Sequence, residues 1–551
     1  MLLSAIVFLP LLFALIIALW PKVNSIRPLA FGLSLIEFIL SLSILQRFDS
    51  SSAALQLVEK HVWIERFGIS YFMGIDGLSL WLVIMTTFLT PIIILASWTS
   101  IDKRVKGFHV CLFILQTAML GTFLAMDAIF YYVFWELSLV PMYFMVGIWG
   151  GARRIYATVK FFIFTMAGSV LMLLAMIYMM YLTQEATGQM SSSLLEFYKL
   201  KIPFVGGEFF SLQTVLFFAF ALAFAIKVPV FPLHTWLPDA HVEAPTPGSV
   251  ILAAVMLKMG TYSFLRWVIP LFPEASEYWS WLFMLIGVIG IVYGALVAMV
   301  QPDIKKLVAY SSVSHMGYVL IGMFTFNAFG LQGSLYQMLN HGISTGALFI
   351  LIGMIYERTH SREISKYGGL AAVLPIFTIF FFIITLSSIA VPMTNGFVGE
   401  FLILLGTFKA MPAYAYVAVL GVVLGAVYML WMFKRVFFGP EGELVKDDHH
   451  PLHDLNLREI AVMVPLVIMV FWMGLFPNQF LDWSKASVEH LIQNRSGYSL
   501  AIYGVTPAEA AATTPAAEPA PEAASAATPE ATATPAPTPT EKATPAKEGT
   551  K

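Results

Sequence analysis

Apolar stretches of membrane length recur along the whole chain and constrain its fold more than any other feature. A helix needs roughly 20 consecutive apolar residues to cross the hydrocarbon core of a bilayer. We count about fourteen such stretches, at 2–20, 29–45, 78–98, 110–124, 128–149, 156–181, 212–231, 249–269, 279–300, 307–326, 331–356, 370–405, 414–438 and 460–476. The 551 residues are 59% hydrophobic and 12% charged, whereas soluble domains carry about 25% charged residues. The sequence therefore predicts an all-α polytopic membrane protein.

The distribution of basic residues predicts the orientation of these helices. No charged segment precedes the first apolar stretch and no Ala-x-Ala site follows it, so we expect a retained helix rather than a signal peptide. Lysine and arginine gather in alternate loops, at Lys22, Arg27, Lys103, Arg104, Lys106, Arg153, Arg154, Lys305, Lys306, Arg358, Arg362, Lys366, Lys434 and Arg435. The positive-inside rule places these loops in the cytoplasm. Both termini are then expected on the outer side.

Two further features limit the chemistry and the extent of the fold. Cys111 is the single cysteine, so the chain can neither form an internal disulfide nor supply the roughly four thiolates of an iron–sulfur cluster. Residues 505–551 are rich in Ala, Pro, Thr and Glu, with hardly an aromatic residue. Such a segment buries too little apolar surface to offset its chain entropy, which predicts a disordered, outward-facing tail.

Four ionisable residues, Glu136, Lys227, Lys258 and Glu400, lie inside apolar stretches or at breaks in them. An ionisable group near the centre of a bilayer costs roughly 2.5–3.5 kcal/mol on insertion scales, so such groups usually mark a path for ions or protons. The alternative for Glu136 is a helix-end carboxylate. Lys258 lies too far from either end of its stretch for its side chain to reach the headgroups easily.

Other charged residues in apolar surroundings have a simpler interpretation. Glu37 and Lys160 lie nearer the ends of their stretches, and Lys409 lies at a stretch end. Long side chains near helix ends often anchor the helix at the membrane interface. We therefore expect these three residues to be anchors rather than parts of an ion path.

Two apolar stretches are expected to break beside a charge. The segment AIKVPVFPLHTWLPDAHVEAPTPG, at 225–248, holds too many prolines for one unbroken helix, since each interior proline removes a hydrogen bond and clashes with the preceding turn. VPMTNGFVGE, at 391–400, interrupts another long stretch just before Glu400. Paired interruptions in two halves of a chain are typical of transporters with inverted repeats. The alternative is a pair of simple kinks.

Four histidines lie close to these features. His234 and His241 follow the first break, and His315 and His341 lie in separate apolar stretches. Imidazole titrates near neutral pH and can both accept and donate a proton, so these residues are candidate accessory members of a relay. Taken singly, His315 and His341 could equally be hydrogen-bonded packing residues, and for His234 and His241 packing is the more usual interpretation.

Several blocks together resemble one known family. They are FYYVFWELSLVPMYF, KVPVFPLHTWLPDAHVEAPTPGS, LKMGTYSFLRW, DIKKLVAYSSVSHMGY, LNHGISTGALF and GFVGEF. In this order and spacing, across roughly 70–440, they resemble the antiporter-like membrane subunits of the proton-pumping NADH-quinone oxidoreductases, the respiratory complex I family. Glu400 stands where the chains L and N of that family, and related sodium/proton antiporter subunits, commonly carry lysine. The low-complexity tail departs from the family pattern.

The resemblance implies a fold, roles and surroundings. The fold would have about fourteen helices with two discontinuous ones and two inverted five-helix repeats, spans 4–8 and 9–13. The corresponding regions are helices 1–3 (1–107), the first repeat (108–270), the second repeat (276–438), a C-terminal helix with its flanks (439–500) and the tail (505–551). Glu136 would modulate the charge of Lys227, Lys258 would be the central relay residue, and Glu400 would end the path on the outer side.

The same resemblance implies a bacterial inner (plasma) membrane location beside other membrane subunits, especially chains L and N. No cofactor is expected in this chain; NADH, FMN, iron–sulfur clusters and quinone are expected in partner subunits. The sequence has no GxxxxGK[ST] segment and no GxGxxG segment after a strand, which argues against nucleotide chemistry here. Nothing in it points to nucleic acid.

Three functions stay open at this point. Moving one charge against 100 mV costs about 2.3 kcal/mol, so uphill transfer needs an external source of free energy. A proton-translocating subunit would take that energy from redox chemistry in its partners, whereas a component of a multisubunit sodium/proton antiporter would take it from another ion gradient. A membrane scaffold would need none.

Overall fold

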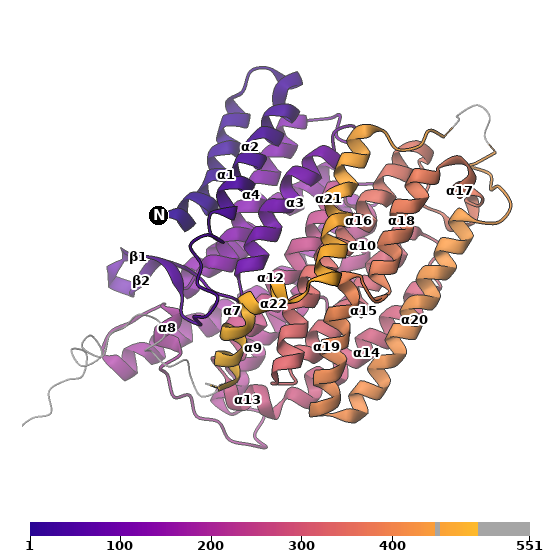
Figure 1. Ribbon diagram of the computed structural model, residues 1–551. Coiled ribbons are helices and arrows are strands. Elements are labelled where there is room, and N and C mark those ends of the chain that lie inside the picture. Colours follow the sequence, from indigo (N-terminus) through magenta and orange to yellow (C-terminus); the bar gives the residue numbers. More distant parts are fainter. Residues whose placement is uncertain (447–451, 494–551) are drawn as a thin grey trace, which may run out of the picture. The chain divides into compact units, whose positions relative to one another are not determined.

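The computed structural model of the chain describes residues 1–446 and 452–493, which form a bundle of helices joined mostly by short connections (Figure 1). Within these residues, 10 helical stretches are long and apolar enough to cross a membrane, and three more apolar helices are shorter. The chain is therefore a mostly helical, multi-pass membrane protein, as predicted. The expected tail at 505–551 lies outside the described residues.

The first half of the bundle contains most of the short helices. Its elements are α1 (Leu2–Leu19), η1 (Val23–Ser25), α2 (Ile26–Leu42), β1 (Gln56–Ile64), η2 (Glu65–Phe67), β2 (Ile69–Ile75), α3 (Leu80–Ala96), α4 (Val105–Leu124), α5 (Ala128–Leu137), α6 (Leu139–Trp149), α7 (Arg154–Thr187), α8 (Leu194–Phe197), α9 (Leu212–Lys227), α10 (Trp236–Glu243), α11 (Thr246–Ile251), η3 (Leu252–Met256), α12 (Leu257–Ser263), η4 (Phe264–Val268) and α13 (Pro273–Tyr278).

The second half is built mainly from long helices. Its elements are α14 (Ser280–Met299), α15 (Ile304–Met323), α16 (Ala328–Thr359), η5 (Ile364–Lys366), α17 (Leu370–Val373), α18 (Pro375–Ser388), α19 (Asn395–Ala410), α20 (Pro412–Phe437), α21 (Leu457–Leu475) and α22 (Asn478–Gln493). Figure 1 shows α1 and α2 at one edge of the bundle and α20 at the opposite edge.

Both predicted interruptions are present. α9 ends at Lys227 and α10 begins at Trp236, whose indole Nε1 donates a 2.9 Å hydrogen bond to the carbonyl of Ile226. This bond supplies a partner for a carbonyl near the broken end of α9. The second break separates α18, which ends at Ser388, from α19, which begins at Asn395. Glu400 therefore lies inside a helix that starts at the break.

Two long elements form the buried centre of the bundle. These elements are the run from α11 to η4, Thr246–Val268, and the helix α16. In each of them, the most apolar stretch of 18 residues is completely buried. Two turns of π-helix, η3 and η4, flank α12 in the first of these elements. Such turns shift the side-chain positions of a helix and occur frequently at functional sites.

A β-hairpin that the sequence analysis did not predict joins α2 to α3. β1 and β2 pair antiparallel, with Lys60 opposite Phe72. Gly68, between the strands, has a φ of +60°, and a side chain there would collide with the backbone of Met190. The amide of Ser70 donates a 2.9 Å hydrogen bond to the Asp127 carboxylate, which also caps α5. The hairpin is thus fixed to the helix that carries Glu136.

Ion pairs connect segments far apart in the sequence. Arg266 Nη2 lies 2.5 Å from Asp76 Oδ1, and both side chains are almost completely buried. Arg358, near the end of α16, binds both carboxylate oxygens of Glu459 on α21, at 3.0 and 2.6 Å. The first pair joins η4 to the start of α3, and the second joins the central helix α16 to the C-terminal part of the bundle.

Candidate functional site

The first part of the site lies where α9 ends. Lys227 is 1% exposed, and its Nζ donates a 3.2 Å hydrogen bond to Ser138 Oγ and lies 5.2 Å from the centre of the Trp135 ring. Glu136 on α5 lies between Trp135 and Ser138 in the sequence, but among the described residues no ion pair within 4.0 Å joins its carboxylate to the Lys227 ammonium. A change in the charge or position of Glu136 would therefore act on Lys227 through space.

The second part lies at the buried centre of the bundle. Lys258 on α12 is 0% exposed. Its Nζ lies 2.6 Å from the Ala253 carbonyl oxygen and 2.7 Å from His341 Nδ1. Ala253 belongs to the π-helical turn η3 and His341 to α16. A buried amine held against an imidazole nitrogen can exchange a proton with it directly, because hydrogen-bond distance is the reach that proton transfer requires.

The third part joins α15 to α19. His315 Nδ1 and Glu400 Oε1 are 2.9 Å apart, and Gln337 Nε2 donates a 3.2 Å hydrogen bond to the same carboxylate oxygen. The ring centroids of His315 and His341 are 6.0 Å apart. The structure thus brings Lys258, both of these histidines and Glu400 into one continuous group of neighbours.

A small polar cavity lies beside the two rings. Its volume is about 10 Å³, and its walls include His315, His341, Asn340 and Ser344. A cavity of roughly 10–15 Å³ with several polar partners can hold one water molecule. Nε2 of each histidine is buried without a hydrogen-bond partner in the described part of the chain. One water in this cavity could connect the rings.

Hydroxyl and amide groups tie the second break to α16. Ser387 Oγ donates a 2.6 Å hydrogen bond to Asn395 Oδ1, and the Ser344 and Ser387 hydroxyls are 2.5 Å apart. These residues come from α18, α19 and α16, respectively. The broken ends are therefore hydrogen-bonded to Ser344, one turn from His341 in α16.

His234 and His241 lie outside the group formed by Lys258, His341, His315 and Glu400. His234 packs near the rings of Phe231 and Tyr293, with centroid distances of 5.8 and 5.2 Å. His241 stacks on Phe349 at 4.6 Å, and both of its ring nitrogens are buried without a partner in the described residues. Their surroundings fit packing residues, and their accessory role stays a prediction.

The loop predicted around Lys305 and Lys306 ends earlier than expected, because α15 begins at Ile304. Lys305 lies in the first turn of α15 and is 6% exposed. Its Nζ donates a 2.6 Å hydrogen bond to the carbonyl oxygen of Ala244, which directly follows α10. Asp303 caps α15, so an Asp followed by an apolar run was a usable signal for a helix start at this point.

Two expected anchors also have other surroundings. Glu37 is 0% exposed, and both of its carboxylate oxygens lack a hydrogen-bond partner within the described chain. It shares the buried face of α2 with Ser34 and Ser41, a polar stripe at helical spacing that the sequence contained. Lys160 Nζ forms a 2.7 Å ion pair with Asp239. Glu37 therefore lacks the exposure expected of an interfacial anchor, and Lys160 is held by a carboxylate of α10.

The site therefore consists of three hydrogen-bonded groups. They hold Lys227 with Ser138, Lys258 with His341, and His315 with Glu400; among the described residues no direct hydrogen bond joins one of these groups to another. The described parts of the chain also contain no group of three or more His, Cys, Asp or Glu side chains placed to hold a metal ion. The amine, imidazole and carboxylate groups of the site can each bind and release a proton.

Known proteins match this chain over most of its length. A family model described as NADH:quinone oxidoreductase/Mrp antiporter, TM, matches residues 125–425, and one described as NADH-ubiquinone oxidoreductase chain 4, amino terminus, matches residues 2–126. NADH-quinone oxidoreductase subunit M of Rhodobacter capsulatus is 44% identical over 501 residues, which cover 90% of this chain and 96% of that protein.

Solved structures show the same fold. A chain in the structure of respiratory complex I from Thermus thermophilus with bound NADH has a TM-score of 0.78 and 31% identity, covering 89% of this chain and 100% of its own length. A chain of the Mrp complex from Dietzia sp. DQ12-45-1b has a TM-score of 0.77 at 22% identity, covering 90% of this chain and 100% of its own. The second likeness concerns the fold alone.

Proposed function

Because this chain belongs to the NADH-quinone oxidoreductase subunit M family, which includes NADH-ubiquinone oxidoreductase chain 4, we propose that it translocates protons as a membrane subunit of an NADH:quinone oxidoreductase. The resemblance found in the sequence is thereby confirmed at the level of the family. We further propose that the chain carries no redox centre and that partner subunits hold the NADH, FMN, iron–sulfur and quinone sites.

One observation carries the proposal: a buried row of titratable groups crosses the centre of the bundle. Lys258, His341, His315 and Glu400 come from four different helical elements and follow one another at 2.7, 6.0 and 2.9 Å, the middle value between ring centroids. Amine, imidazole and carboxylate groups can each bind and release a proton. Four separate helical elements would rarely bring such groups together in an apolar interior without a use for them.

In the proposed cycle, Glu136 controls Lys227 and the central row completes transfer. A nearby carboxylate stabilises the charged form of a buried lysine, whereas low polarity alone disfavours it. Moving or neutralising Glu136 would therefore promote release of a proton from Lys227 toward Lys258. His341 and His315 would pass that proton to Glu400, from which it would leave on the outer side.

The decisive experiment measures quinone reduction and proton pumping together in inverted membrane vesicles. We expect Lys227→Ala and Glu136→Gln to lower both rates, because redox turnover coupled to a blocked relay should slow with it. A scaffold would leave pumping intact in both variants, provided that the complex assembles. Glu136→Asp, which keeps the carboxylate, is the matched control and should retain most of the activity.

The alternative, a component of a multisubunit sodium/proton antiporter, has less support. This chain is 44% identical to a subunit M but 22% identical to the matching chain of the Mrp complex, which shares the fold. Copurification separates the two functions. We expect flavin- and cluster-bearing subunits to copurify with the tagged chain. The purified complex should then pump protons without added sodium.

We also propose the surroundings of the chain. Its expected neighbours are other membrane subunits of the complex, especially chains L and N, and the lipid bilayer. The loops rich in Lys and Arg support a bacterial inner membrane location with both termini on the periplasmic side, and the charge bias keeps the same direction when the buried Lys305 is left out. Cysteine-accessibility labelling of residues in opposite loops would test this orientation.

A further inference from the structure

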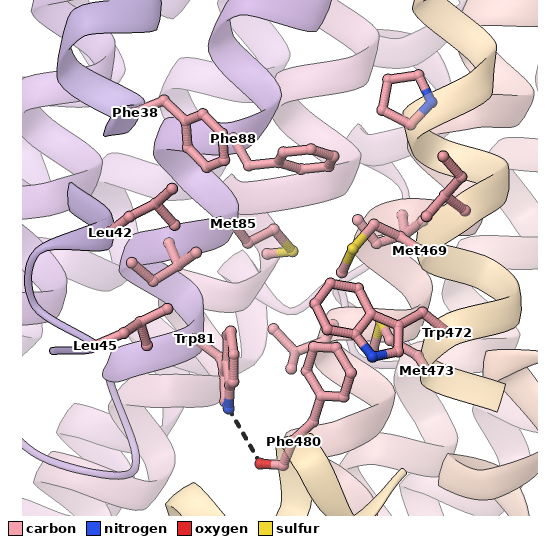
Figure 2. Close-up of a pocket in the computed structure, with 15 residues that line it drawn as sticks. Phe38, Leu42, Leu45, Trp81, Met85, Phe88, Met469, Trp472, Met473 and Phe480 are labelled. Carbon is pink, nitrogen blue, oxygen red and sulfur yellow. Dashed lines mark hydrogen bonds between the residues drawn. The ribbon is translucent and has the colours of Figure 1, made fainter. Parts of the chain in front are cut away.

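A deep apolar pocket lies apart from the relay, between the N-terminal helices and α21. Its volume is about 400 Å³. Figure 2 shows Phe38 and Leu42 of α2 on one side, Met469 of α21 on the other, and Phe480 of α22 at one end. The side chains that form its walls are aliphatic, aromatic or methionine, together with one proline.

Water is a poor occupant for this pocket. A buried water needs two to four polar partners, and cavities lined only by apolar groups stay dry and accept apolar guests. The indole of Trp81, one of the few polar groups in the wall, already donates a 3.1 Å hydrogen bond to the Phe480 carbonyl. An unfilled space of this size would also deprive its walls of dispersion contacts. The chemistry of the walls selects a hydrocarbon guest.

Helices of membrane-crossing length and composition surround the pocket. α2 and α21 are both of membrane-crossing length, and α3 is a shorter apolar helix. At the α22 end, the Trp472 indole N–H donates a 2.6 Å hydrogen bond to Gln479 Oε1. Trp472 and Trp81 therefore both line the pocket with apolar rings while their N–H groups are hydrogen-bonded. Tryptophans with this arrangement are typical of the membrane interface. The pocket therefore extends from one interface into the hydrocarbon region.

We propose that this pocket binds one acyl chain of a bilayer phospholipid. A single alkyl chain needs no hydrogen-bond partner, and the two indole N–H groups in the wall are already bonded. A single alkyl chain is narrow and flexible enough to enter between α2 and α21. Met85 and Met469 provide adaptable walls for it, since the unbranched thioether side chain fills irregular gaps.

The bound chain would contact the element that carries a relay residue. Leu339 and Ile343, on either side of His341 in α16, belong to the pocket wall. Met85, also in the wall, lies so close to Gly342 that a side chain at this glycine would contact its sulfur. The acyl chain would thus support α16 from the side opposite the polar cavity, independently of the transport role of His341.

Photolabelling of the whole complex tests the proposal. The complex is reconstituted in vesicles of phosphatidylethanolamine and phosphatidylglycerol that contain phosphatidylethanolamine with a diazirine on its acyl chain. After illumination, labelled peptides are mapped by mass spectrometry. We expect label on pocket residues of α2, α3 and α21, and about a tenfold loss of this label in Met469→Trp, because an indole added there fills the pocket.

The matched control is Val464→Trp, which places the same side chain on the exposed face of α21, outside the pocket. It should leave the pocket label unchanged. Leu42→Phe fills the pocket from the opposite wall and replaces Met469→Trp if that variant does not assemble. Retained quinone reductase activity shows that each complex is intact.

Three outcomes would overturn the proposal. Wild-type label spread equally over Val464 and the pocket would show ordinary lipid contact rather than a site. A crosslink between the pocket and a peptide of a partner subunit would show that protein fills it. Displacement of the label by excess long-chain quinone, without loss by excess phospholipid, would identify an isoprenoid tail as the occupant.

Discussion

His341 gives the sharpest test of the central row, because it is the group that contacts Lys258. Its Nδ1 lies 2.7 Å from the lysine Nζ, and its ring centre lies 6.0 Å from that of His315. His341→Ala removes the imidazole and leaves an enlarged polar cavity between Lys258 and His315. A proton would then have to cross this gap through water rather than through a fixed side chain.

The expected magnitude follows from the lost contact. A hydrogen bond to a charged group contributes about 1.5–3 kcal/mol. If this stabilisation is lost in the transition state for transfer from Lys258, the step slows by about 13-fold to 160-fold, since each 1.36 kcal/mol changes a rate tenfold. Water entering the cavity can replace part of the contact, so we expect the observed effect near the lower end of this range.

The assay is proton uptake by inverted vesicles, recorded together with NADH-driven quinone reduction. His109→Ala is the control, because His109 is also buried but binds the Val105 carbonyl within its own helix, at 2.8 Å. We expect normal pumping in this control and a partial recovery of His341→Ala by added imidazole. Unchanged pumping in an assembled His341→Ala complex would refute the role of His341, whatever the effect of imidazole.

Further predictions concern the structure around the relay. Asp76→Ala removes the carboxylate that balances the charge of buried Arg266, so we expect the complex to lose about 3–5 kcal/mol of stability. The measurement is the melting temperature of the complex, and an unchanged melting temperature would contradict the prediction. Burial lowers the pKa of His490 on α22, and nearby Asp76 opposes the shift. The folded state then binds this proton less readily than the unfolded state, so stability present above roughly pH 6.5 declines as the pH falls below it. Hydrogen exchange in α22, corrected for its intrinsic pH dependence, should therefore accelerate on acidification in the wild type and much less in His490→Leu. Gly399→Val should displace the Gln337 amide, which a side chain at 399 would overlap, and lower pumping more than Gly399→Ala does.

The helices and both breaks could be predicted because they follow from local physics. Apolar length determines where a segment can cross a bilayer, and the predicted stretch 2–20 agrees with α1 at Leu2–Leu19. Proline density determined the first break, which the structure has between Lys227 and Trp236. The hairpin at 56–75 was missed, although its first strand, QLVEKHVWI, precedes Gly68 at a turn. The two inverted repeats and the domain limits drawn from them stay predictions.

The pairing of site residues could not be predicted, because it depends on distances between helices. Lys258 and His341 are 83 positions apart, and His315 and Glu400 are 85 apart. A single sequence shows that each is polar in an apolar stretch, but not which of them meet. The burial of Lys305 was missed for a related reason: a lysine close to a helix start can turn inward to a carbonyl of another element, here Ala244.

The missing bond between Lys227 and Lys258 is itself expected of a pump. A permanently hydrogen-bonded row from one side of the membrane to the other would let protons return down the gradient, releasing about 2.3 kcal/mol per charge at 100 mV. A pump must therefore interrupt its own path for part of each cycle. Lys227 lies at the end of a broken helix and is held by one 3.2 Å hydrogen bond to Ser138, whereas Lys258 is fixed between Ala253 and His341. The mobile partner at this interruption should then be Lys227. Substitutions that stiffen the α9–α10 break should slow pumping without raising the passive proton leak, while substitutions that bridge Lys227 to Lys258 with a new polar side chain should raise the leak.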